Sequence, residues 1–473
     1  MPSREPTGSC DERNAVTDSV DLLIQHADLL ATVDTDGREI AGGWVAITDG
    51  LVSGVGAAGS EPRADRTIDA SGCLVTPGLI NTHHHLYQNL TRAYGPALDG
   101  NLFHWLRTLY PKWARLDEEA AFVSAWVGLA ELAESGCTTS TDHLYVHPRG
   151  GGDLLSAEIA AAVELGVRFH PTRGSMSLSE KDGGLPPDSV VQDDDTILAQ
   201  SEEAVRRHHD RSHGAMVRVA LAPCSPFSVT ADLMKRTAEL AERLDVRLHT
   251  HLAEDVDEDD FCMEMFGARP IDHFEAVGWA SDRSWIAHCV QPDDDEIERL
   301  GGWRVGVAHC PSSNMILGSG VAPVRKLRAA GVPVGLGCDG SASADSGSLW
   351  TEARNAMLSG RLKGFLDGTR SLMSSRDVLE MATRGGAACL GREGELGELS
   401  VGAVGDVVLW SLDGLSFAGA LSDPIEAWLR CGPTSARTTI VGGTVVVDNG
   451  SLVADNTEDR LAQHRRIAEA MQR

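Results

Sequence analysis

The stretch that decides the fold is Pro77-Gly78-Leu79-Ile80-Asn81-Thr82-His83-His84-His85-Leu86-Tyr87-Gln88. An apolar run at 73–75 leads into it and predicts a short buried strand. In an extended segment alternate side chains share a face, so His83 and His85 point the same way and His84 points away. Two imidazoles on one face at the end of a buried strand supply half of a metal site. The alternative is a histidine-rich loop. The histidines and carboxylates that follow later predicted strands argue against it.

The composition limits the kind of protein. The chain has 473 residues, enough for two domains or for one large barrel with additions. Its formal net charge of −28 disfavours a nucleic acid or an anionic membrane as partner, but not a small neutral heterocycle. The ten cysteines form no Cys-x-x-Cys pair, which fits reduced thiols in the cytoplasm. We find no signal peptide and no apolar run of about 18 residues, so we predict a cytoplasmic protein without a membrane span.

Both ends of the chain carry strand patterns. Residues 1–19 are polar and predict a disordered leader. Short apolar runs separated by Asp-Gly and Gly-Ser turns follow from residue 20 and predict a small antiparallel β unit. Strand patterns return after residue 400. We predict one β-sandwich built from 20–72 and 400–455, followed by a C-terminal helix over 456–473.

The middle of the chain, 73–399, alternates strand-like runs with amphipathic helical patterns. The eight runs are Leu74–His83, Thr138–Leu144, Val167–Arg173, Val217–Pro223, Val246–Leu252, Trp285–Cys289, Val305–Pro311 and Val332–Asp339. The clearest helical patterns are Ala120–Ser135, Asp153–Leu165, Ala231–Leu244 and Val321–Ala330. This alternation predicts an α/β fold, a (β/α)₈ TIM-type barrel inserted in the terminal β-sandwich. A doubly wound open sheet is the competing fold.

Imidazoles and carboxylates follow four of the predicted strands. The first strand ends at His83 and His85, and the eighth ends at Asp339. The fifth and sixth strands end at a further set, His251, Glu254 and His288. Active sites of such barrels lie at the C-terminal ends of the strands. Histidines with a carboxylate suit Zn²⁺, with Fe²⁺ as the second choice, and leave a position for water.

The order of these motifs resembles the amidohydrolase superfamily, and within it the mononuclear deaminases and triazine hydrolases. The resemblance covers about residues 20–455. It rests on Asn81-Thr-His-His-His-Leu-Tyr-Gln, His251-Leu-Ala-Glu, Ala287-His-Cys-Val-Gln, Gly306-Val-Ala-His-Cys-Pro-Ser-Ser-Asn and Gly335-Leu-Gly-Cys-Asp-Gly. Related sites with two metal ions use a lysine on the fourth strand, and the run Val217–Pro223 has none. The resemblance therefore implies one divalent ion per chain.

The resemblance also implies roles for the residues at the strand ends. The metal ligands would be His83, His85, His251 and Asp339. Glu254 would carry protons to a ring nitrogen and to the departing amine, and His288 would help to deprotonate the attacking water. His249 alternates with His251 on the same strand, but the spacing to Glu254 favours His251 as the ligand. His249 is then expected to be buried and hydrogen-bonded.

Substrate contacts are harder to assign. Gln88 carries an amide that suits the N–H and carbonyl edge of a purine, although a polar loop residue would look the same. Arg173, at the end of the third strand, suits either a purine carbonyl or a structural ion pair. The other candidates are the aromatic residues Tyr87, Trp105 and Trp113, which could cover the pocket or belong to the core, and Asn314 on the seventh strand's loop.

The activity expected from this resemblance is hydrolytic deamination of an oxopurine, with 8-oxoguanine giving urate and ammonia. Guanine or a pterin are alternative substrates. A second alternative is an s-triazine hydrolase that expels chloride or an alkylamine, and a third is a metal-free scaffold protein, which the retained ligands disfavour. We also predict a homo-oligomer, a dimer or larger.

Overall fold

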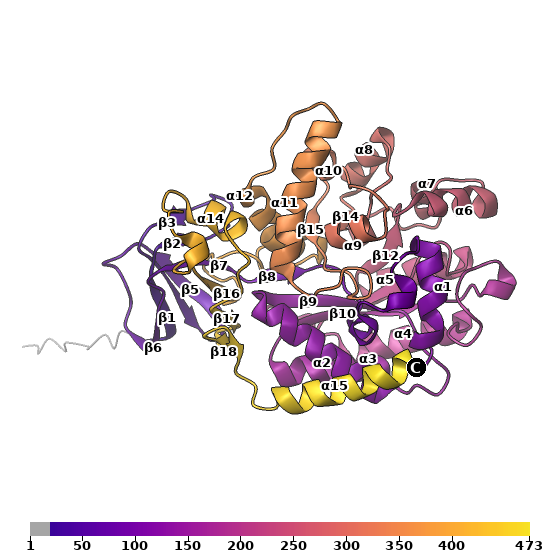
Figure 1. The fold of residues 1–473 in the computed structure, drawn as a ribbon, viewed down its shortest axis with the longest axis horizontal. Coiled ribbons are helices and arrows are strands. Elements are labelled where there is room, and N and C mark those ends of the chain that lie inside the picture. Colours follow the sequence, from indigo (N-terminus) through magenta and orange to yellow (C-terminus); the bar gives the residue numbers. More distant parts are fainter. Residues whose placement is uncertain (1–18) are drawn as a thin grey trace, which may run out of the picture.

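The computed structural model describes residues 19–473, so all but one residue of the predicted leader lies outside the described part. Eight parallel strands close into a barrel in the order β10-β11-β12-β13-β14-β15-β8-β9, with helices around it (Figure 1). The prediction of a TIM-type barrel is confirmed, and the open sheet is wrong. The barrel strands are β8 (Leu79–Asn81), β9 (Cys137–Leu144), β10 (Arg168–Ser175), β11 (Ala220–Pro223), β12 (Leu248–Leu252), β13 (Ser284–His288), β14 (Gly306–His309) and β15 (Val334–Leu336).

The chain passes from the outer sheet into the barrel at Pro77 and Gly78. The run 74–83, predicted as a single strand, forms two: β7 (Cys73–Pro77) in the outer sheet and β8 in the barrel. A Cβ at Gly78 would stand 2.0 Å from the Thr138 hydroxyl oxygen, so only glycine allows this close approach. The histidines therefore follow a barrel strand of three residues.

Two further sheets form a sandwich beside the barrel. One has the order β5-β4-β1-β6 and the other the order β19-β18-β17-β16-β7-β2-β3, so strands from both chain ends share a sheet, as Figure 1 shows on its left. Their strands are β1 (Val20–Ala27), β2 (Leu29–Ala31), β3 (Glu39–Ile40), β4 (Gly43–Thr48), β5 (Leu51–Gly56), β6 (Ala64–Asp69), β16 (Val407–Ser411), β17 (Thr438–Val441), β18 (Thr444–Asp448) and β19 (Ser451–Leu452). The sandwich built from both ends is confirmed. The purely antiparallel unit is wrong, because β1 pairs with β6 and β2 with β7 in parallel.

A shared core explains why the two ends pack together. Leu22 and Ile47 from one sheet join Val75, Leu409 and Ile440 from the other in one buried cluster. Burial of each such side chain stabilises the folded state by about 1.5–3 kcal/mol. Because the cluster takes its side chains from both ends of the chain, neither end forms this core alone.

Several of the helices around the barrel start at side-chain caps. Asp117, Asp153 and Thr230 accept hydrogen bonds from backbone N–H groups of α2, α3 and α5. The α-helices are α1 (Leu102–Trp113), α2 (Glu118–Glu134), α3 (Leu154–Leu165), α4 (Asp194–His208), α5 (Ala231–Leu244), α6 (Val256–Phe266), α7 (Pro270–Ala276), α8 (Asp294–Trp303), α9 (Pro311–Ile316), α10 (Val324–Ala329), α11 (Leu349–Leu366), α12 (Ser375–Glu380), α13 (Gly386–Cys389), α14 (Pro424–Arg430) and α15 (Thr457–Gln472). A π-helical turn, η4 (Met381–Gly385), joins α12 to α13.

The C-terminal helix α15 packs against the turn that follows the histidines. It lies along α2 at the lower edge of Figure 1. Its His464 Nε2 lies 2.8 Å from Asn89 Oδ1, and Gln472 Nε2 donates to the Leu90 carbonyl at 2.8 Å. Both partners belong to η1 (Leu86–Thr91), the turn that follows the histidines.

Two general features of the described residues can be checked directly. The cysteines among residues 19–473 are free, and all but Cys431 are buried. No helix in this part of the chain is both long and apolar enough to cross a membrane.

Candidate active site

Three histidines and a carboxylate converge at the C-terminal end of the barrel. His85 Nε2 lies 3.1 Å from His251 Nε2 and 3.2 Å from Asp339 Oδ1, and His83 Nε2 lies 3.3 Å from the same carboxylate oxygen. Ligand atoms of a tetrahedral zinc site, each about 2.0–2.1 Å from the metal, are separated by roughly 3.3 Å. The four atoms therefore have the spacing of a zinc ligand set. All four residues are buried.

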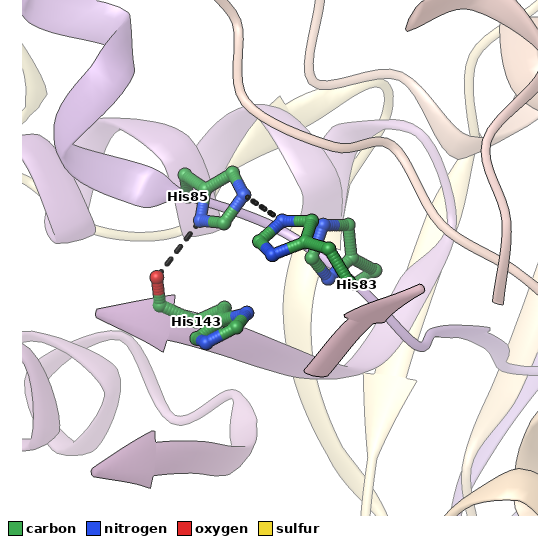
Figure 2. Close-up of side chains that lie close together, drawn as sticks. His83, His85 and His143 are labelled. Atoms are coloured by element: carbon green, nitrogen blue, oxygen red, sulfur yellow. Dashed lines mark hydrogen bonds between the residues drawn. The ribbon is translucent and has the colours of Figure 1, made fainter. Parts of the chain in front are cut away.

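Hydrogen bonds to the outer ring nitrogens leave Nε2 of each histidine directed inwards. His85 Nδ1 donates to the His143 carbonyl at 2.8 Å, a bond drawn in Figure 2, and His251 Nδ1 donates to the Cys224 carbonyl at 2.7 Å. His83 Nδ1 pairs with His249 Nε2 at 2.8 Å, and His249 Nδ1 donates to the Trp285 carbonyl at 2.9 Å. Such partners fix the tautomer of metal-binding histidines. His249 is buried and hydrogen-bonded, as predicted.

Electrostatics keep His83, His251 and Asp339 in the protonation states that suit a metal ion. Burial holds the pKa values of His83 and His251 well below the usual range of histidine, so both rings are neutral. Burial opposes ionisation of Asp339, but the close contacts with His83 and His85 hold its pKa well below the usual range. Metal binding requires neutral imidazoles and a charged carboxylate. The residues present therefore fit a divalent cation.

Glu254 and His288 stand next to this cluster. His288 Nε2 lies 3.6 Å from Glu254 Oε2 and 4.0 Å from Asp339 Oδ2. His288 Nδ1 donates to Asn314 Oδ1 at 2.9 Å, which orients the ring. Burial, and then the charges of Asp339 and Asp255, raise the pKa of Glu254 well above its usual range. A protonated carboxyl group beside a histidine can supply a proton in general acid catalysis.

The backbone at the site is held in unusual conformations. The φ angles of Ala253, His288 and Asp339 are +54°, +72° and +59°. Residues other than glycine adopt such angles only when the surroundings impose them, and they cluster at functional sites. Asn81 shows one source of this constraint. Its side chain accepts a hydrogen bond from Cys338 N at 2.9 Å and donates one to Ser140 Oγ at 3.0 Å, which ties β8 to β9 and to the segment that follows β15.

His143, on β9, is a site residue that our sequence analysis missed. Its ring stacks on His251 with centroids 4.8 Å apart, and Figure 2 shows it beside His83 and His85. His143 Nε2 donates to the Ala222 carbonyl at 3.0 Å, while Nδ1 is buried without a partner. Two overlapping groups of residues can hold a metal, His83-His85-His143-His251 and His83-His251-His288-Asp339. The strand-end rule that selected His83 would also have found His143.

A narrow cavity opens beside the cluster, with a free volume of about 30 Å³. Gln88 and Trp105 from the predicted substrate contacts lie in its wall. The full lining is His85, Gln88, Leu102, Trp105, Leu106, Tyr110, Tyr145, Cys224, Phe227, His251, Glu254, His288, Leu317 and Asp339. The volume holds about one water molecule, so a two-ring substrate needs more room than this conformation provides.

The structure places the other predicted contacts outside this wall. Trp113 packs on Tyr87 with ring centroids 5.4 Å apart and donates to Thr91 Oγ1 at 3.1 Å, so both aromatic residues belong to the core behind the site. Asn314 accepts a hydrogen bond from His288 Nδ1 and so orients that ring. Arg173 lines a separate cavity and donates to Gln192 and Gln200 at 2.7 and 2.6 Å.

Comparisons with known proteins agree with this geometry. A sequence model of the amidohydrolase family matches residues 74–446. The 8-oxoguanine deaminase of Pseudomonas aeruginosa is 47% identical over 444 residues, which cover 93% of this chain and 97% of that protein. The hydroxydechloroatrazine ethylaminohydrolase of Pseudomonas sp. strain ADP is 37% identical over 89% of each chain. The solved structure of atrazine chlorohydrolase from Arthrobacter aurescens TC1, complexed with zinc, has a TM-score of 0.90 and 33% identity and covers 94% of this chain and 100% of that one. This chain therefore belongs to the amidohydrolase family.

Proposed function

We propose that this chain is a metal-dependent aminohydrolase that converts 8-oxoguanine and water into urate and ammonia. The observation that carries the proposal is the pairing of Glu254 with His288, 3.6 Å apart, beside a cluster with the spacing of metal ligands. Such a site supplies both the activated water and the proton donor that loss of an amine needs. The identity to an 8-oxoguanine deaminase over nearly the full length of both chains supports the choice of ring.

The proposed ligands are His83, His85, His251 and Asp339, which would bind one Zn²⁺, or Fe²⁺ as the second choice. When bound, such an ion lowers the pKa of a coordinated water to about 7. His288 Nε2 would accept the proton that this water loses. Glu254 would first protonate the ring nitrogen next to the attacked carbon. Glu254 would regain a proton from His288, whose Nε2 lies 3.6 Å from Glu254 Oε2. It would then protonate the exocyclic amine, because an amide anion is too poor a leaving group. The C–N bond would break to release ammonia, and the added hydroxyl would return its proton to His288 as the carbonyl forms.

A substrate screen tests the proposed function. The purified protein, loaded with Zn²⁺, is assayed for ammonia release from 8-oxoguanine, guanine, isoxanthopterin and an aminotriazine. We expect 8-oxoguanine to give the highest kcat/KM. Release of chloride or an alkylamine from a triazine, without ammonia from any purine, would instead support the triazine hydrolase alternative. The predicted homo-oligomer and cytoplasmic location stay predictions.

Gln88 supplies unpaired polar atoms to the pocket wall. Both its Oε1 and its Nε2 are buried without a partner among the described residues. A Cβ at position 340 would stand 1.8 Å from Gln88 Oε1, so Gly340 provides the space that the amide occupies. Buried polar groups without partners cost about 1–3 kcal/mol each, and a bound ring with a carbonyl and an N–H could satisfy this pair. We propose that Gln88 binds the six-membered ring.

Replacement of Gln88 by leucine tests this contact. Leucine has a similar size but no polar atoms, so we expect kcat/KM for 8-oxoguanine to fall by about 10-fold to 10²-fold with full metal content. Steady-state kinetics and elemental analysis measure the two quantities. Gln463→Leu, on α15 outside the pocket, is the control. An unchanged kcat/KM in Gln88→Leu would show that Gln88 is a loop residue without a role in binding.

A further inference from the structure

We propose that Glu258 is the positioning residue that holds Glu254 beside His288. The proposal rests on the proposed function, because it identifies the residue that positions the acid–base group of that mechanism. Glu258 lies on α6 and its side chain is fully buried. Ala253 N donates to Glu258 Oε1 at 3.1 Å, and Glu254 N donates to Glu258 Oε2 at 2.8 Å.

These two bonds differ from ordinary capping of a helix. In a capping box, the glutamate at the third helical position accepts from the backbone N–H of the N-cap residue. Asp255 is the N-cap of α6, and Glu258 stands at the third position. Its carboxylate reaches past Asp255 to the two preceding N–H groups, one of which belongs to Glu254. Both carboxylate oxygens of Glu258 therefore accept hydrogen bonds from the segment that carries the acid–base residue.

The segment needs such support because its backbone is strained. Ala253 has a φ of +54°, a left-handed conformation that is unfavourable for residues other than glycine. Its carbonyl accepts from Val290 N at 2.8 Å and from Gln291 N at 3.0 Å, in the loop that follows His288. The backbone at Ala253 thus joins Glu258 on one side to the His288 loop on the other.

The carboxylate of Glu254 has little support of its own. Among residues 19–473, no group donates a hydrogen bond to it, and its nearest ionic partner is His288 Nε2 at 3.6 Å. Its position is therefore determined mainly by its own backbone, which Glu258 holds. Burial raises the pKa of Glu258 to about 8, while the two N–H groups favour its charged form.

The test compares Glu258→Gln and Glu258→Ala with Glu264→Gln, which removes an exposed carboxylate from the same helix. Glutamine keeps one acceptor and alanine keeps none, so we expect kcat to fall in the order wild type, glutamine, alanine. The loss in Glu258→Gln should be about 10-fold to 10²-fold, as expected for a misplaced catalytic group. KM and metal content should change little. A kcat within twofold of wild type in Glu258→Gln would overturn the proposal.

A double-mutant cycle separates positioning from general stability. If Glu258 acts through Glu254, then Glu258→Gln should cause almost no further loss in protein that already carries Glu254→Gln. Independent, multiplicative losses would show that Glu258 only supports the fold. Thermal unfolding and metal analysis accompany every variant.

A crystal structure of Glu258→Gln supplies a readout that needs no activity. The proposal expects the Glu254 carboxylate to leave its place beside His288, and an unmoved carboxylate would overturn it. Failure of the proposed function looks different: the wild-type protein would release no ammonia from any ring.

Discussion

Glu254→Gln is expected to bind metal and substrate as the wild type does but to lose turnover by at least about 10²–10⁴-fold. Positioned acid–base groups contribute a factor of this size. Glutamine has nearly the same shape but cannot deliver a proton. In the structure, Glu254 is the carboxyl group beside His288 that is not part of the proposed ligand set. Among residues 19–473, Asp339 is the other carboxyl group within 4.0 Å of His288 Nε2, and the proposed mechanism assigns it to the metal.

Three measurements check this prediction. Steady-state kinetics on 8-oxoguanine give kcat and KM, elemental analysis gives the metal content, and equilibrium binding of substrate to Glu254→Gln shows whether the pocket is intact. Glu264→Gln, an exposed residue on α6, should behave like the wild type. Near wild-type deamination by Glu254→Gln with full metal would mean that Asp339 or His288 carries both protons.

The site residues at the strand ends were predictable from the sequence. The rule that barrel active sites lie at the C-terminal ends of the strands needs only the order of the strands and the periodicity of apolar residues. Apolar runs followed by His83, His251, His288 and Asp339 indicate both the strands and the edge where their ends meet. The separation of β7 and β8 into two different sheets was not predicted, because both strands are buried and form one apolar run. The sheet to which each strand belongs is decided by pairing partners far away in the chain.

Substrate contacts were less predictable because the relevant side chains come from segments without a periodic pattern. Gln88 lies on the turn after His85, and its place in the wall depends on the space left at Gly340. Arg173 lies near the end of the barrel strand β10, yet its side chain donates hydrogen bonds to Gln192 and Gln200, away from the cluster. The position of a residue in a strand determines where its backbone lies in the barrel. The direction of a long side chain depends on the residues that surround it.

The second large effect is expected from the proposed metal ligands. We predict about one divalent ion per chain and a joint loss of metal and activity when Asp339 is replaced by asparagine. Asp339 Oδ1 lies 3.3 Å from His83 Nε2 and 3.2 Å from His85 Nε2, as close as ligands of one ion. Asparagine keeps the size but not the charge that offsets the cation. Affinity for metal should fall by more than the roughly 10–100-fold typical of residues that only orient ligands.

His143→Asn is the matched comparison, because His143 belongs to the competing group of possible ligands. Its Nε2 already donates to the Ala222 carbonyl, and its own carbonyl orients His85 through a backbone bond that the substitution keeps. We therefore expect His143→Asn to retain the ion with at most the roughly 10–100-fold weaker affinity of an altered orienting residue. Elemental analysis after desalting and chelator competition measure both variants, with circular dichroism to confirm folding. If His143→Asn lost the ion while Asp339→Asn kept it, the ligands would be the four histidines, and Asp339 would be free to accept the proton of the attacking water. A content near two ions per chain would mean that both groups bind metal.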